Sequence, residues 1–238
     1  MYGWRGRIGL LIPSSNTTME EEFRRVLPEG VSLHVARMRL KNVTVKELME
    51  MEKYALNAVE ELVDADVDLI VYGCTTGSLI GGINYDTHLS RMLSERAGIP
   101  VITTATAVCK ALKTLNISKV SVATPYIEDV NLKEKEFLEA HGFKVVKIKG
   151  LGITSNIEIG KQPPHIVYKL AREVDNSEAD GIFISCTNLR TLEIIDVLER
   201  DLDKPIVSSN QATLWATLKT LRVKERYDKL GVLIRNHL

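Results

Sequence analysis

Two cysteines lie in similar short motifs that are far apart in the chain. Cys74 stands in the run Gly-Cys-Thr-Thr-Gly-Ser, and Cys186 stands in the run Ser-Cys-Thr-Asn-Leu. Each motif follows an apolar run typical of a strand, so we expect each thiol at a strand-to-helix turn. Backbone N–H groups and the positive end of a helix dipole would lower the pKa of a thiol there and favour the reactive thiolate. Burial as a small apolar residue is the alternative for any free cysteine, and we expect it for Cys109, which lacks such a motif.

Both motifs belong to an internal repeat. Cys74 and Cys186 are 112 positions apart, and so are Pro13 and Pro125, which end two similar apolar runs. A repeat of this length indicates a duplicated domain, because solenoid units recur every ~20–50 residues. Ligands of open α/β sheets bind at the carboxyl ends of the strands. We therefore expect both Cys-Thr turns to face one cleft between the two halves.

The elements that must position these turns are alternating strands and helices. Strands are expected over residues 6–12, 32–37, 69–72, 101–103, 120–123, 144–148, 181–185 and 206–208. Helices are expected over residues 17–26, 44–63, 87–97, 130–140, 164–174 and 189–199. This alternation predicts an α/β fold of two similar Rossmann-like lobes, each a short parallel sheet flanked by helices, related by a pseudo-two-fold axis. We assign residues 1–115 plus 208–238 to the lobe with the first thiol and 116–207 to the other.

Neutral hydrogen-bonding side chains gather at the same predicted strand ends. Ser14 and Asn16 follow the first strand, where capping of the next helix is an alternative role, and Tyr126 follows the fifth, where a core tyrosine is the alternative. Asn156 lies in a polar loop that could equally form an Asx turn. Others follow the two cysteines, namely Thr75, Thr76, Ser78, Thr187 and Asn188. Together they could bind an anionic oxygen. The segment 208–212 is expected mainly to cap the closing helix.

Composition excludes several classes of protein. The 238 residues carry 31 Lys plus Arg and 31 Asp plus Glu, so the basic field needed for nucleic-acid binding is missing. No apolar run approaches the ~20 residues of a membrane span, and no signal peptide is evident, so we expect a cytoplasmic protein. Three widely spaced cysteines suit neither disulfides nor zinc, and none of the five histidines lies in a strand-end turn. Without a glycine-rich phosphate loop either, we expect no cofactor and no metal.

The two Cys-Thr turns resemble those of the aspartate/glutamate racemase superfamily. Within it, the motifs around Asn16, Cys74, Tyr126, Asn156 and Cys186 are most similar to maleate cis-trans isomerases. Racemases usually show Cys-Asn-Thr and then Cys-Thr-His, and arylmalonate decarboxylases keep only the second cysteine. The resemblance implies cofactor-independent conversion of maleate to fumarate through a succinyl-cysteine. It implies that Cys74 is the nucleophile, that Cys186 is the acid and base, and that the neutral donors listed above bind the substrate.

Other functions remain open at this stage. A two-cysteine amino-acid racemase or an arylmalonate-type decarboxylase could use the same two-sided site, and a non-catalytic dicarboxylate-binding module is a further alternative. The expected partner is a small dicarboxylate. Apolar helical faces over residues 44–63 and 87–93 favour a homodimer or higher homo-oligomer, although helices that cover a sheet show the same pattern.

Overall fold

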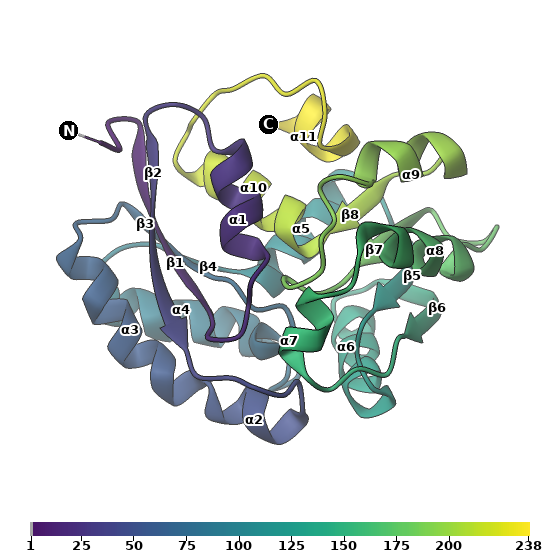
Figure 1. Cartoon of the computed structure of the whole chain (residues 1–238), viewed down its shortest axis with the longest axis horizontal. Helices are drawn as coiled ribbons and strands as arrows, with labels where there is room; N and C mark the ends of the chain where they lie inside the picture. The colour runs from purple at the N-terminus through teal and green to yellow at the C-terminus, as the bar shows by residue number, and fades with distance from the viewer. Residues whose placement is uncertain (1) are drawn as a thin grey trace.

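The computed structural model describes residues 2–238, which form two four-stranded sheets whose strands all run parallel. The strand order is β2-β1-β3-β4 in the first sheet and β6-β5-β7-β8 in the second, so the two sheets have the same topology. Figure 1 shows them on opposite sides of the molecule, with α5 and α10 between them. The strands are β1 (Gly6–Pro13), β2 (Val31–Met38), β3 (Leu69–Tyr72), β4 (Val101–Thr103), β5 (Lys119–Thr124), β6 (Lys144–Gly150), β7 (Gly181–Ile184) and β8 (Ile206–Ser208).

The duplication inferred from the sequence is repeated in individual hydrogen bonds. The carboxylate of Asp68 accepts a bond of 2.7 Å from the backbone N–H of Arg7 at the start of β1. In the second sheet, Asp180 accepts a bond of 2.7 Å from the backbone N–H of Lys119 at the start of β5. Both pairs keep the 112-residue offset of the sequence repeat. The predicted two-lobed α/β fold is therefore confirmed.

Two predicted helices differ in the structure. The helix expected over residues 44–63 is divided into α2 and α3, because the Met51 N–H bonds to Leu48 three residues back and so tightens the turn. The helix expected over residues 189–199 begins only at Ile195, because the N–H groups of Thr191 and Leu192 donate to the Glu22 carboxylate instead of the chain. The helices are α1 (Met19–Val26), α2 (Val45–Glu50), α3 (Glu52–Asp64), η1 (Thr76–Ser78), α4 (Tyr85–Ala97), α5 (Thr104–Thr114), α6 (Glu128–Ala140), α7 (Asn156–Gly160), α8 (Pro164–Val174), α9 (Ile195–Leu202), α10 (Ser209–Thr220) and α11 (Gly231–His237).

The core consists of two buried layers that run through both sheets. Because side chains alternate along a strand, β1 sends Leu11 into one layer and Leu10 and Ile12 into the other. The first layer also contains Cys74 and Cys186, so the two thiols belong to one continuous buried cluster. Among residues 2–238 no helix is both long and apolar enough to cross a membrane.

Candidate active site

The first thiol, Cys74, follows β3 and is only 5% exposed. The backbone N–H of Gly77 donates to its sulfur at 3.3 Å, and the Thr76 hydroxyl lies 3.9 Å from it. The turn continues into the single 3-10 turn η1 rather than into an α-helix. Tyr72, the last residue of β3, is fully buried, and this burial raises the pKa of its phenol, with a further increase from negative charge on Cys74.

The second thiol, Cys186, follows β7 and is also 5% exposed. Its backbone φ is 110°, an unfavourable value for a residue with a side chain, of the kind often kept at functional sites. The N–H of Asn188 donates to the sulfur at 3.4 Å, and the Tyr126 hydroxyl acts to lower the pKa of the thiol. Each thiol thus accepts one backbone N–H, from the third residue after Cys74 and from the second residue after Cys186.

Burial, however, raises the pKa of both thiols. It raises the pKa of Cys74 to about 11 and that of Cys186 to about 12, although the N–H and hydroxyl contacts act in the opposite direction. The prediction of a lowered thiol pKa is wrong because no α-helix begins at either turn and because both sulfurs are removed from water. Negative charge on Cys74 also raises the pKa of Cys186. Both thiols are neutral at rest. Cys109 is buried on α5, as expected.

Direct hydrogen bonds join the two thiol turns. The Thr187 hydroxyl donates to the carbonyl of Gly73 at 3.1 Å, and the Asn16 amide donates to the Thr187 hydroxyl at 3.0 Å. The two Cys-Thr turns therefore meet, as predicted, because a residue next to one thiol bonds directly to a residue next to the other.

A second link runs through the start of α10. The hydroxyl of Ser209 accepts the backbone N–H of Cys186 at 3.0 Å and the hydroxyl of Thr75 at 2.8 Å. Ser208 forms the predicted cap of α10, with a full capping box. Ser209 was missed as a site residue because the helix cap accounted for the whole segment.

Asn16 has both of the roles that the sequence left open. Its carbonyl oxygen accepts the N–H groups of Thr18 and Met19, each at 3.0 Å, at the start of α1. Its amide N–H₂ faces the other lobe and reaches Thr187. One side chain therefore caps the start of α1 and links it to the second lobe.

Asn156 and Asn188 bond to each other and to the loop after β1. The Asn188 amide donates to the backbone carbonyl of Asn156 at 2.7 Å, and the Asn156 amide donates to Ser15 at 2.9 Å. Both asparagines are buried.

Two other predicted site residues, Ser14 and Ser78, bond to the backbone. Ser78 bonds to the carbonyls of residues 74 and 75 and accepts the N–H of residue 105, and the exposed Ser14 bonds to the backbone of residue 40. A direct substrate contact for these two stays a prediction.

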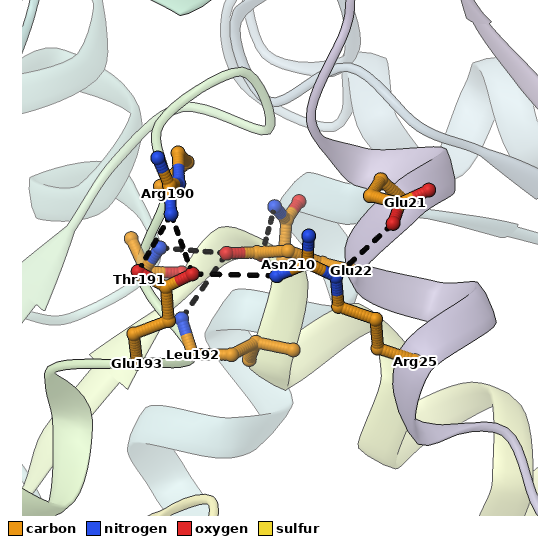
Figure 2. A network of polar contacts seen from close by, with 8 residues as sticks. All are labelled: Glu21, Glu22, Arg25, Arg190, Thr191, Leu192, Glu193 and Asn210. Carbon is orange, nitrogen blue, oxygen red and sulfur yellow. Dashed lines mark hydrogen bonds and ion pairs between the residues drawn. The ribbon is translucent and has the colours of Figure 1, made fainter. Parts of the chain in front are cut away.

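Behind the Cys186 turn lies a buried carboxylate that the sequence did not reveal. Glu22 of α1 accepts the N–H groups of Thr191 and Leu192 at 2.7 and 3.1 Å, and the Asn210 amide donates to it at 2.6 Å (Figure 2). The same amide also donates to the carbonyl of Thr187. Burial raises the pKa of Glu22 to about 6 despite these bonds. Its place on an otherwise acidic helix gave no signal of burial.

The site is closed in this structure. The loop after β2 pairs with the loop before α7 through a bond of 2.7 Å from the Val43 N–H to Thr154 and one of 3.0 Å from the Asn156 N–H to Lys41. A cavity of about 400 Å³ near Glu22 opens instead between α1 and residues 190–193, and neither thiol lines it.

Within residues 2–238 no group of three or more His, Cys, Asp or Glu side chains could hold a metal ion.

Residues 8–234 match the arylmalonate decarboxylase family. The chain belongs to this family. It is 30% identical to a maleate isomerase of Geobacillus stearothermophilus over 96% of each chain. Among solved structures of the family, a mutant maleate isomerase of Pseudomonas putida S16 with maleate has a TM-score of 0.93 at 28% identity and covers 98% of each chain. A Nocardia farcinica maleate cis-trans isomerase mutant with a covalently bound succinylcysteine intermediate has a TM-score of 0.92 at 28% identity, over 97% of this chain and 98% of that one. With relatives of this kind over almost its whole length, the chain is an enzyme of the isomerase class.

Proposed function

We propose that this chain converts maleate to fumarate, with Cys74 as the nucleophile and Cys186 as the acid and base. The observation that carries the proposal is the joining of the two thiol turns through Thr187 and Ser209 into one site with a sulfur from each lobe. A single-thiol decarboxylase would not need the first sulfur. The succinylcysteine intermediate of the Nocardia farcinica relative supports a covalent step.

Cys74 first loses its proton to solvent, and from then on the reaction balances with one proton that moves between Cys186 and the substrate. The Cys74 thiolate bonds to C2 of maleate, and the π electron pair moves toward C3 and its carboxylate. Cys186 gives its proton to C3, which leaves a thioether on Cys74 and a thiolate on Cys186. The C2–C3 single bond then rotates. The Cys186 thiolate removes a proton from C3, the double bond forms again, and the C2–S bond breaks.

Ionising Cys74 is the costly step. With its pKa raised to about 11, roughly one molecule in a thousand carries the thiolate at pH 8, which corresponds to about 4 kcal/mol. The Gly77 N–H and the Thr76 hydroxyl reduce that cost. A thiolate of high pKa is a stronger nucleophile than one of low pKa. Once formed beside the reacting carbon, the Cys74 thiolate therefore attacks faster, which offsets part of the cost of ionisation.

Neutral donors suit a dianionic substrate. Asn16, Tyr126 and Asn156 are buried at the meeting of the lobes, and we assign them to the two carboxylates. They are supported there by Thr75, Thr76, Thr187 and Asn188. Donors fixed in advance stabilise the extra charge that develops in the transition state, at about 3 kcal/mol for each donor. Entry requires the loop that carries Val43 to part from the loop that carries Thr154.

The deciding experiment offers maleate, aspartate and phenylmalonate to the enzyme in heavy water. We expect fumarate from maleate, no exchange of the α-hydrogen of aspartate, and no carbon dioxide from phenylmalonate. Intact-protein mass after maleate should show an adduct of one substrate mass on Cys74, most abundant in Cys186→Ser. Cys74→Ser and Cys186→Ser should lose turnover, with Cys109→Ser as the matched control that keeps it. Fumarate formation by Cys74→Ser would refute the covalent step.

A further inference from the structure

The turn that carries Cys186 is held by two consecutive residues at the start of α10. The backbone φ of Cys186 is 110°, which a residue with a side chain keeps only when its surroundings hold it there. On one side of this residue, the Ser209 hydroxyl accepts the Cys186 N–H at 3.0 Å. On the other side, the Asn210 amide donates to the carbonyl of Thr187 at 3.1 Å. The conformation of Cys186 therefore depends on the orientation of the Asn210 side chain.

Glu22 sets the orientation of the Asn210 amide. The same nitrogen that reaches Thr187 also donates to the Glu22 carboxylate at 2.6 Å (Figure 2). Both neighbours are acceptors, so only the N–H₂ end of the amide can face them. The oxygen end, Asn210 Oδ1, is buried and has no hydrogen-bond partner within residues 2–238. Because leaving a buried oxygen unpaired is costly, the two acceptors must outweigh that cost.

The other oxygen of the same carboxylate holds the far end of the segment that follows Cys186. Glu22 Oε1 accepts the backbone N–H groups of Thr191 and Leu192 at 2.7 and 3.1 Å (Figure 2). Glu22 belongs to α1, which follows β1 of the first sheet, whereas the segment follows β7 of the second. One buried carboxylate thus holds residues 187–192 at both ends, directly at 191 and 192 and through Asn210 at 187.

We propose that Glu22 is a positioning residue for Cys186, because its carboxylate keeps the Asn210 amide turned toward Thr187 and so keeps the second thiol in its reactive conformation. Its own proton takes no part. An amide cannot replace this carboxylate, since all three contacts of Glu22 are donors. In Glu22→Gln the new N–H₂ group would face either Asn210 or the two backbone N–H groups, and one of the two holds on the segment would be lost.

The inference rests on the proposed function for its role in turnover, but its first test needs no substrate. Full-length chains are alkylated with iodoacetamide at pH 8, and the rates at Cys186 and Cys74 are measured in the same sample by peptide mass. General unfolding exposes both thiols, so the ratio of the two rates reports on the Cys186 turn alone. We expect the Cys186-to-Cys74 ratio to rise several-fold in Glu22→Gln and in Asn210→Ala, because the released turn opens more often.

Two variants serve as matched controls. Glu21→Gln removes an exposed carboxylate from the same helix. Asp180→Asn alters a carboxylate that accepts the backbone N–H groups of residues 118 and 119, at the opposite end of β7 from Cys186. Both should keep the wild-type ratio, the second despite a loss of stability. An unchanged ratio in Asn210→Ala, which leaves both N–H bonds of Glu22 in place, would overturn the inference even if Glu22→Gln folds poorly.

A second test uses maleate. Glu22→Gln and Asn210→Ala should lower kcat for fumarate formation about tenfold to 100-fold. The share of protein with a maleate adduct on Cys74 should rise above that of the wild type, as in Cys186→Ser, because a displaced Cys186 removes the proton from C3 slowly. Adduct and activity that fall together would indicate a merely structural role and overturn the inference. A wild type that forms neither adduct nor fumarate would refute the proposed function, while the alkylation ratios still decide whether Glu22 holds Cys186.

Discussion

The hydroxyl of Thr187 lies 3.1 Å from the carbonyl oxygen of Gly73 and donates to it, which fastens the residue after one thiol to the residue before the other. The two residues come from different lobes and are 114 positions apart. The Asn16 amide completes the connection by donating to the same hydroxyl. The relative position of the sulfurs is therefore set by a short chain of neutral, buried hydrogen bonds.

Thr187→Val should break this connection while keeping the shape of the side chain. A buried carbonyl and a buried amide lose their partner, at about 1–3 kcal/mol each. Because a displacement of about 1 Å at a reacting group can cost ~100-fold, we expect kcat for fumarate formation to fall by that order. Thr217→Val is the control, since the Thr217 hydroxyl bonds only within α10. Equal activity of the two variants would show that the link between the lobes is dispensable.

Asn16→Asp should separate the two roles of Asn16. An aspartate can still accept the N–H groups of Thr18 and Met19, so the cap of α1 is kept. It cannot donate to Thr187, and its charge repels a dianionic substrate. We expect kcat/KM to fall ~100-fold or more. Asn16→Ala should lose activity as well. Because it also loses the cap of α1, its free energy of unfolding should fall by about 1 kcal/mol. An active Asn16→Asp enzyme would remove Asn16 from the substrate site.

Glu22 should make the stability of the fold depend on pH. Its pKa in the folded chain, about 6, is above the usual value of 4.5, so this group favours folding most below pH 4.5 and loses that contribution as the pH rises through 6. The change amounts to about 2 kcal/mol. The free energy of unfolding of the wild type relative to Glu22→Gln should fall by that amount between pH 4.5 and 7. A constant difference would mean that the carboxyl titrates normally.

Glu22→Ala tests the same carboxylate as a hydrogen-bond acceptor. Three buried donors, from Thr191, Leu192 and Asn210, would lose their acceptor. At about 1–3 kcal/mol for each, we expect a loss of several kcal/mol in denaturant unfolding and a weakened Cys186 turn. Glu21→Ala, at an exposed position of the same helix, is the matched control.

The reactivity of Cys74 should keep rising with pH well beyond the range of an ordinary thiol. With a pKa raised to about 11, the rate of alkylation at Cys74 should increase about tenfold per pH unit from pH 7 to pH 10. Peptide mass after timed exposure to iodoacetamide measures this rate. A plateau between pH 8 and 9 would show that the sulfur is better solvated than its 5% exposure indicates.

The sequence contains a second, weaker repeat that bears on Ser209. The run Ile-Pro-Val-Ile at residues 99–102 resembles Lys-Pro-Ile-Val at residues 204–207, with an offset of 105 that aligns Ser209 with Thr104, the first residue of α5. Both open helices between the sheets, and Thr104 bonds to the carbonyl of Tyr72 next to the first thiol.

The sequence by itself determined the eight strands, the duplication and the meeting of the two Cys-Thr turns. These depend on local apolar runs and on a constant 112-residue offset, and both patterns are visible in the amino-acid sequence. Only the tertiary structure decided the protonation of the thiols, since burial by distant residues outweighs the N–H contacts within each turn. It also decided which donors bond to each other across the lobes and placed Glu22 behind the Cys186 turn. Solvation and hydrogen-bond partners depend on neighbours in space, which no local pattern specifies.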